Sequence, residues 1–154
     1  MNVAEIMTTG PAYASPDTPL QEVASIMVHQ DCGQIPICDR ASAKPIGVVT
    51  DRDIVCRTIA RGLNPLNMKA SECMSEPCVT VSVDASLDEC CRLMEKYQVR
   101  RLPVVDERGE LCGIVSQADV AHHHLEAHAG RLLKSLSQPR QTVLREQRQG
   151  QRAA

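Results

Sequence analysis

The sequence predicts a mixed α/β (α+β) fold made of two β-α-β-β-α repeats packed as a pseudo-twofold pair. Residues 15–39 match residues 82–106 at a fixed offset of 67, and seven of these 25 positions are identical. Residues 47–54 match residues 113–120 at an offset of 66. In both copies, short apolar runs alternate with segments that have helical spacing. Self-similarity at a fixed period indicates a repeat architecture, and the two kinds of spacing indicate its strands and helices.

The first elements of each copy are expected to be a short strand and a helix. The strand is expected over 12–15 in the first copy and over 79–83 in the second. Thr18 is a good N-cap residue, Pro19 suits the first helical position, and Gln21 completes a capping box. Apolar residues then follow at helical spacing in both copies: Leu20, Val23, Ala24, Met27 and Val28, and Leu87, Cys90, Cys91, Met94 and Tyr97.

The rest of each copy is expected to form a pair of strands and a second helix. In the first copy the strands cover 35–38 and 46–50, and the helix begins near Asp51. In the second copy the strands cover 102–105 and 111–116, and the helix begins near Gln117. The one-residue change of offset falls between these strands, in a loop, where changes of length are tolerated.

Composition and charge exclude some classes of function. The chain of 154 residues is 43% hydrophobic and 23% charged, as in a soluble globular protein, and it has two Tyr but no Phe or Trp. Stacking platforms for single-stranded nucleic acid are therefore nearly excluded. The first 120 residues hold 11 Lys/Arg and 17 Asp/Glu, which argues against a general nucleic-acid surface.

The cellular compartment is predicted from the same composition. No apolar run approaches the roughly 20 residues that span a bilayer, and no signal peptide is recognisable. We therefore expect a cytoplasmic protein with no membrane partner, whose eight Cys are reduced thiols.

Both copies resemble CBS domains, the modules named for cystathionine β-synthase. The strongest marks are the segments 47–53 (Gly-Val-Val-Thr-Asp-Arg-Asp) and 113–119 (Gly-Ile-Val-Ser-Gln-Ala-Asp). Ile-Pro-Ile at 35–37 and Leu-Pro-Val at 102–104 lie at the expected distance upstream. The chain thus resembles a stand-alone tandem CBS-domain (CBS-pair) protein of bacterial type. We expect repeat 1 over 1–66, repeat 2 over 67–128, and a short helix with a basic, partly disordered tail over 129–154.

Two hydroxyl–carboxylate pairs are candidate ribose ligands: Thr50 with Asp53, and Ser116 with Asp119. Each pair lies three residues apart at an expected strand-to-helix turn. A carboxylate there can accept two hydrogen bonds from a vicinal diol, and the hydroxyl can serve a ribose oxygen or an α-phosphate. The resemblance implies this ribose role. The same spacing also fits a capping box at a helix start, so capping alone remains an alternative.

Basic residues beside these pairs are candidate phosphate ligands. The resemblance implies that Arg100 and Arg101 reach phosphates, and Arg52 is a candidate for the first cleft. The alternative is a solvated Arg pair that contacts Glu95 or Asp106. The first copy has Gly-Gln at 33–34 in the matching place, so the two clefts are not expected to be equivalent.

An adenine ring needs an apolar slot, which the resemblance implies is built from the first strand and the Ile-Pro or Leu-Pro segment of each copy. The matching residues are Tyr13, Ile35, Pro36, Thr80, Val81, Leu102 and Pro103. Ordinary core packing is the alternative for each of them, and for Tyr13 the alternatives are stacking on a base and packing at the module surface.

The resemblance implies a non-catalytic regulatory module that binds an adenosine-containing ligand in the clefts between the repeats. The ligand is AMP, ADP, ATP, an NAD-type or an S-adenosyl compound, and the chain signals to an unknown target protein by a change of conformation or dimer geometry. We also expect a homodimer. No Gly-x-Ser-x-Gly, P-loop or Gly-x-Gly-x-x-Gly motif is present.

Two other functions stay open. One is a dimerising scaffold whose clefts are degenerate and bind nothing. The other is a redox or metal sensor built on the Cys and His residues. We expect no metal to be required, because the cluster at 122–124 and His128 lack a Cys-x-x-Cys partner or ligand spacing.

Overall fold

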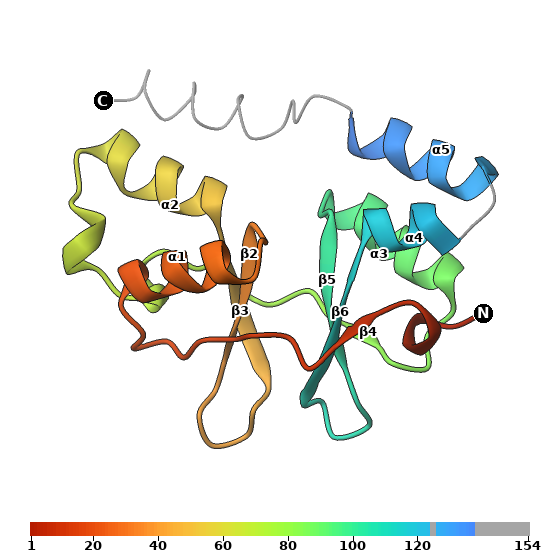
Figure 1. Ribbon diagram of the computed structural model, residues 1–154, viewed down its shortest axis with the longest axis horizontal. Helices are drawn as coiled ribbons and strands as arrows, with labels where there is room; N and C mark the ends of the chain where they lie inside the picture. Colours follow the sequence, from red (N-terminus) through yellow and green to blue (C-terminus); the bar gives the residue numbers. More distant parts are fainter. Residues whose placement is uncertain (124–125, 138–154) are drawn as a thin grey trace.

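The structure is a computed structural model that describes residues 1–123 and 126–137, with the backbone alone at 126–129. Two similar halves lie side by side, with strands in the middle of the molecule and helices towards its two ends (Figure 1). The predicted mixed α+β fold with two repeats is confirmed. The elements up to residue 72 are η1 (Val3–Glu5), β1 (Thr8–Thr9), α1 (Leu20–His29), β2 (Gln34–Cys38), β3 (Pro45–Thr50), α2 (Asp51–Arg57), η2 (Ile59–Arg61), η3 (Pro65–Asn67) and η4 (Ala70–Glu72), where η is a 3-10 helix. The remaining elements are β4 (Val81–Ser82), α3 (Leu87–Tyr97), β5 (Arg101–Val105), β6 (Leu111–Ser116), α4 (Gln117–His123) and α5 (Glu126–Leu136).

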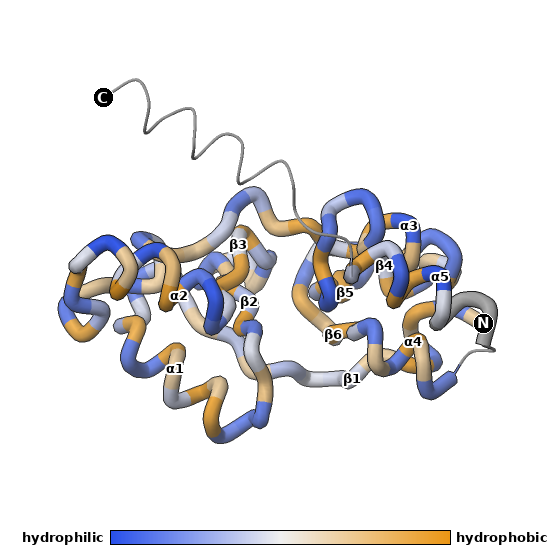
Figure 2. The backbone as a smooth tube through the Cα atoms, turned by 90° about the horizontal axis from the view of Figure 1, so that it is seen from above, coloured by the Kyte–Doolittle hydropathy of each residue, from blue (hydrophilic) through white to orange (hydrophobic). Residues whose placement is uncertain are grey.

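Each half is built on one antiparallel hairpin. β2 pairs with β3 so that Gln34 lies opposite Thr50, and β5 pairs with β6 so that Arg101 lies opposite Ser116. β4 adds to β5 in parallel, and β1 adds to β6. Hydrophobic colour marks long stretches of β3, β5 and β6 in the middle of the molecule (Figure 2).

The strand expected over 12–15 is reduced to one bridge, from Ala14 to Ile37. The N–H of Ala14 donates to the carbonyl of Pro36 at 3.0 Å, and nothing longer forms. The physical reason is Pro16. Its counterpart in the second copy is Val83, whose N–H donates to Val105 at 2.9 Å. Proline has no N–H, so the first copy cannot extend this ladder.

The predicted cap of the first helix is wrong. α1 begins at Leu20 with Pro19 as N-cap and no side-chain cap, so Thr18 and Gln21 form no capping box. Instead, the Thr18 hydroxyl accepts from the N–H of Ser15 at 3.0 Å and closes the preceding turn. The free N–H of Leu20 donates to the carbonyl of Met68 at 2.9 Å, a partner from the chain between the repeats.

The segments that lead into the two copies are exchanged between the halves. The N–H of Val3 donates to Ala85 at 2.9 Å, in the second half. The N–H of Ala70, which is 67 residues further on, donates to Thr18 at 2.8 Å, in the first half. Val3 and Ile6 accordingly belong to the hydrophobic core of the second half. Ala70 and Cys73 belong to that of the first. Each half therefore needs a segment that precedes the other half, and the expected boundaries at 66 and 128 stay predictions.

A close backbone approach fixes each exchanged segment. A Cβ at Gly47 would lie 2.9 Å from the carbonyl oxygen of Ser75, and one at Gly113 would lie 3.1 Å from that of Thr8. Glycine at both positions lets the segments pair with β3 and β6, through the bridge from Val48 to Ser75 and through β1.

α5 completes the second half. It packs against α3 and α4, with Leu132 and Leu136 buried in the core and Leu133 60% exposed. Within the described residues, no helix combines the length and the apolar character that a membrane span needs.

Candidate functional site

The two strand-to-helix turns place the candidate ribose ligands at the start of α2 and α4. In the first turn, the N–H of Thr50 donates to Asp53 Oδ2 and the N–H of Asp53 donates to Thr50 Oγ1, both at 3.0 Å. In the second turn, the N–H of Ser116 donates to Asp119 Oδ2 at 2.7 Å and the N–H of Asp119 donates to Ser116 Oγ at 3.2 Å. Both pairs thus form capping boxes. Capping uses Oδ2 of each carboxylate, and the ribose role stays a prediction that concerns Oδ1.

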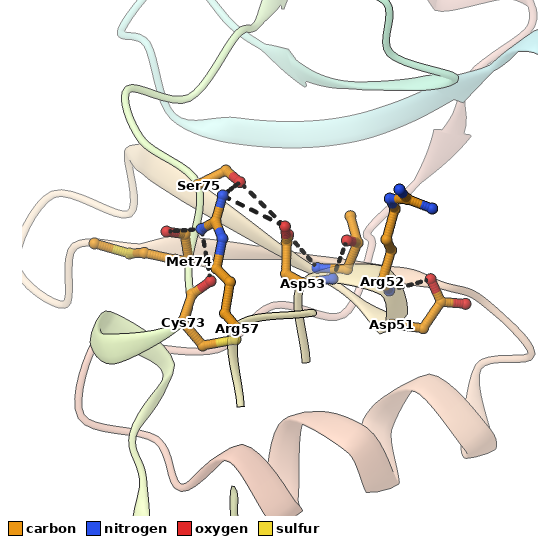
Figure 3. A network of polar contacts seen from close by, with 8 residues as sticks. Asp51, Arg52, Asp53, Arg57, Cys73, Met74 and Ser75 are labelled. Carbon is orange, nitrogen blue, oxygen red and sulfur yellow. Dashed lines mark hydrogen bonds and ion pairs between the residues drawn. The ribbon is translucent and has the colours of Figure 1, made fainter. Parts of the chain in front are cut away.

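In the first turn, Oδ1 of Asp53 belongs to a polar network (Figure 3). It lies 3.5 Å from Nη2 of Arg57 and accepts from the Ser75 hydroxyl at 3.4 Å. Arg57 also donates from Nη1 to the carbonyls of Cys73 and Met74, at 2.9 and 2.7 Å, and from Nη2 to the Ser75 hydroxyl at 2.9 Å. The Asp53 side chain is 15% exposed. The network therefore ties α2 to the exchanged segment that follows η4.

Sequence reasoning did not find Arg57. The signal was present, because Arg57 lies four residues after Asp53 and so on the same face of α2. Its main partners could not be predicted, because they are backbone carbonyls 16 and 17 residues away.

In the second turn, Oδ1 of Asp119 makes no hydrogen bond or ion pair with the described residues. The Ser116 hydroxyl bonds to the other oxygen, Oδ2, at 2.7 Å. The residue that corresponds to Arg57 is His123, at an offset of 66, and its side chain is exposed. The second turn therefore keeps one carboxylate oxygen for another partner.

Arg100 and Arg101 lie beside the second turn. The carbonyl of Arg100 accepts from the N–H of Gln117 at 2.9 Å. Arg101 lies directly opposite Ser116 in the β5–β6 ladder, so the two side chains share a face of the sheet. In the described part of the chain, neither Arg pairs with Glu95 or Asp106, and Glu95 instead lies 3.7 Å from Arg131. The role of both guanidiniums at a phosphate stays a prediction.

The charged residues around the first turn differ from those around the second. Gly33 takes the place of Arg100, and its carbonyl accepts from the N–H of Asp51 at 3.1 Å. A Cβ at Gly33 would lie 2.8 Å from Asp51 Oδ2, so that carboxylate lies against the position where the other copy has an Arg. Arg52 is exposed. The first turn thus carries Asp51 and Asp53 with Arg52 and the bound Arg57, whereas the second carries Asp119 next to the strand positions of Arg100 and Arg101.

Gln117 is a further polar residue of the second turn that sequence reasoning missed. Its Oε1 atom is buried and has no hydrogen-bond partner among the residues that the structure describes. Buried polar atoms are normally paired. A free buried acceptor on Gln117 can serve a ligand N–H or a water molecule.

The candidate adenine residues fall into three environments. The side chains of Ile35, Val81 and Leu102 are at most 2% exposed and belong to the two cores. Pro36 and Pro103 are also buried, and they alternate with those core residues, on the other face of β2 and β5. Thr80 is half-buried and Tyr13 is 57% exposed. If an adenine binds here, the two prolines, Thr80 and the strand backbone are its possible contacts, and this role stays a prediction.

Most of the cysteines are buried or half-buried thiols, whereas Cys56 is exposed. Burial raises the pKa of the Cys78 and Cys90 thiols to about 12 and that of Cys38 to about 11. These groups are therefore thiols at neutral pH, and a thiol is a weaker nucleophile and metal ligand than a thiolate. All eight cysteines are free.

The histidine cluster is only partly described. His122 and His123 are exposed in the last turn of α4, and the side chains of His124 and His128 lie outside the described residues. Across the described ranges, no three His, Cys, Asp or Glu side chains are grouped as a metal site would need. The expectation that no metal is required stays a prediction.

Known proteins share this architecture. The family model for the CBS domain matches residues 3–57 and 70–126. The CBS domain-containing protein YhcV of Bacillus subtilis is 38% identical over 137 residues, which are 88% of this chain and 95% of that protein. Hypoxic response protein 1 of Mycobacterium tuberculosis is 36% identical over 138 residues, which are 88% of this chain and 93% of that protein.

Solved structures of CBS-domain proteins are also similar to this chain. The crystal structure of Hypoxic Response Protein I with two coordinated zinc ions has a TM-score of 0.73 at 36% identity, over 81% of this chain and 100% of that one. The CBS domain pair of protein MJ0100, in complex with 5'-methylthioadenosine and S-adenosyl-L-methionine, has a TM-score of 0.71 at 26% identity. That match covers 79% of this chain and 94% of that one.

Proposed function

The chain belongs to the CBS-domain family and carries two CBS domains in tandem, and on that premise we propose that it is a non-catalytic regulatory module for an adenosine-containing ligand. The ligand is AMP, ADP, ATP, an NAD-type or an S-adenosyl compound. Its binding changes the conformation or the dimer geometry of the module, and a target protein responds to that change.

One observation carries this proposal: Asp119 Oδ1 makes no hydrogen bond or ion pair with the described residues, and its turn lies beside the backbone of Arg100 and Arg101. A ribose presents a vicinal diol, which a carboxylate oxygen binds by accepting hydrogen bonds. The Ser116 hydroxyl donates its one hydrogen to Oδ2 of the same carboxylate at 2.7 Å and can accept a hydrogen bond from a ribose hydroxyl. Arg100 and Arg101 supply the positive charge that a phosphate needs.

The comparison with the MJ0100 pair supports the class of ligand. Both compounds in that complex contain an adenosyl group, and neither contains a phosphate. The common part of the ligand is therefore the nucleoside, which we assign to the Ser116–Asp119 turn. For this chain, the guanidiniums favour a nucleotide over an uncharged nucleoside.

We also propose that the module forms a homodimer in the cytoplasm. Two small repeats leave helix faces uncovered, and Val28 on α1 and Val55 on α2 are 79% and 53% exposed. A scaffold with degenerate sites is the second candidate function. The observation that favours it is the Arg57 network, which occupies Asp53 in the first turn.

Thermal unfolding of the full chain against a panel of AMP, ADP, ATP, NADH, S-adenosylmethionine, 5'-methylthioadenosine and a cyclic dinucleotide tests the proposal. A ligand at about 100 times its dissociation constant stabilises the folded state by about 2.7 kcal/mol. For a chain of this size that raises the midpoint by roughly 5–10 °C. Zinc chloride is a separate arm, because a zinc-bound relative exists.

Three results are distinguishable in this panel. A shift with an adenosine compound supports the ligand module. A stable dimer with no shift from any compound supports the scaffold. A shift with zinc alone supports a metal sensor and contradicts the proposal.

A further inference from the structure

The two turns occupy equivalent positions in the two repeats. They differ in the residue found four positions after the Asp of each turn, and in the contacts that this residue makes. Arg57 in α2 corresponds to His123 in α4. The residues that Arg57 contacts, at 73, 74 and 75, correspond at an offset of 67 to residues 6, 7 and 8. Those two segments lie in the same place on their halves, because Ser75 bridges to Val48 and Thr8 pairs with Ile114. From this equivalence we expect a side chain at position 123 to reach the carbonyls of residues 6 and 7 and the hydroxyl of Thr8.

We propose that this position decides whether a turn is a clamp or a ligand site. Arg57 makes the first turn a clamp that holds the exchanged segment, and His123 leaves the second turn open. The chain then binds one adenosine nucleotide for its two CBS domains, at Ser116 and Asp119. This inference rests on the proposed function and adds to it the number of sites, their location and the positioning residue that sets them.

The contacts of Arg57 explain why the first turn is closed. Its guanidinium makes three hydrogen bonds and an ion pair, and two of the bonds satisfy the carbonyls of Cys73 and Met74. A diol that took Asp53 Oδ1 would have to displace Arg57 and the Ser75 hydroxyl from it. Arg57 can move away from Asp53 only by breaking its charge-assisted hydrogen bonds to the carbonyls of Cys73 and Met74, so this displacement is costly. The carboxylate of Asp51 beside Gly33 also repels a phosphate.

The second turn lacks all of these obstacles. Asp119 Oδ1 makes no hydrogen bond or ion pair with the described residues, and Gln117 stands where the first turn has Asp51. Gln117 Oε1 is buried and unpaired, and Arg100 and Arg101 lie alongside. Gln117 in place of Asp51, and Arg100 and Arg101 in place of Gly33 and Gln34, favour an anionic ligand at the second turn.

The test installs the clamp in the second turn. In His123→Arg, the new guanidinium is expected to bind Asp119 Oδ1 and the carbonyls of Ile6 and Met7. His122→Arg is the matched control, because it adds the same charge at the neighbouring exposed position of α4. Binding of AMP and of 5'-methylthioadenosine is measured by calorimetric titration of the full chain, with all variants in one buffer.

We expect wild type to bind one nucleotide per chain. His123→Arg should weaken binding of both compounds by about tenfold or more, the range for loss of a hydrogen bond to a charged group, and should raise the unfolding midpoint. His122→Arg should leave affinity within about twofold. Asp119→Asn should weaken binding as His123→Arg does, and Asp53→Asn should retain it. If His123→Arg does not fold, the comparison of Asp119→Asn with Asp53→Asn tests the inference instead.

Three results overturn the inference alone: two nucleotides per chain, equal effects of the two His variants, or binding that depends on Asp53 and not on Asp119. If wild type binds neither compound and nothing in the panel shifts its midpoint, the proposed function fails together with the inference. If a different panel member shifts the midpoint, the same variants are titrated with that compound.

Discussion

Replacing Leu132 by alanine should lower the free energy of unfolding by about 3 kcal/mol, in the range for a buried Leu→Ala change. Leu132 is 1% exposed and belongs to the core of the second half. It lies on α5, which packs against α3 and α4. Truncation leaves a cavity that rigid neighbours fill only in part. Urea unfolding measures the change.

The neighbouring residue supplies the control for this prediction. Leu133 has the same side chain on the same helix but is 60% exposed, so Leu133→Ala should change the stability by less than about 0.5 kcal/mol. Equal losses in the two variants would show that α5 is not docked through Leu132.

Replacing Arg57 by methionine should cost about 2–3 kcal/mol of folding stability, because a chain of similar length replaces the guanidinium and leaves its partners unpaired. The carbonyls of Cys73 and Met74 lose donors, and Asp53 loses its ion pair while it remains 15% exposed. Thermal and urea unfolding of the full chain measure the loss.

His123→Met is the matched variant for Arg57→Met in the other repeat. It removes a side chain that is exposed, so the expected change is below about 0.5 kcal/mol. If Arg57→Met proved as mild as His123→Met, the network around Asp53 would carry no stability, and the first turn would be as free for a ligand as the second.

The strands and helices that flank the two turns could be predicted from the sequence because the repeat presents each pattern twice. The expected strand over 111–116 agrees with β6, and the helix starts at Asp51 and Gln117 agree with α2 and α4. A fixed offset aligns the hairpins, and one alignment then assigns both halves.

Predictions from local pattern failed where a distant partner or a proline intervened. Thr18 has the residue type of an N-cap, but its hydroxyl bonds to Ser15, and Met68 supplies the acceptor that α1 needs. Pro16 removes the donor that extends the matching strand of the second copy. The exchange of the lead-in segments could not be predicted either, because their similarity does not tell which core each one completes.

The candidate site shows the same limit. Thr50, Asp53, Ser116 and Asp119 could be predicted from spacing, and the structure brings each pair together. The difference between the turns depends on Arg57, whose partners include backbone carbonyls of a segment that only the fold brings near. Comparison of the repeats shows that positions 57 and 123 are equivalent. Only the structure shows that Arg57 binds Asp53 and backbone carbonyls.

The most direct test of the central claim is a crystal structure of the full chain grown with AMP. We predict one AMP per chain, with a ribose hydroxyl within hydrogen-bond distance of Asp119 Oδ1 and the phosphate beside Arg100 or Arg101. Arg57 should keep its contacts with Asp53 and the carbonyls of Cys73 and Met74. AMP bound with its ribose on Asp53, or away from both turns, would contradict the account.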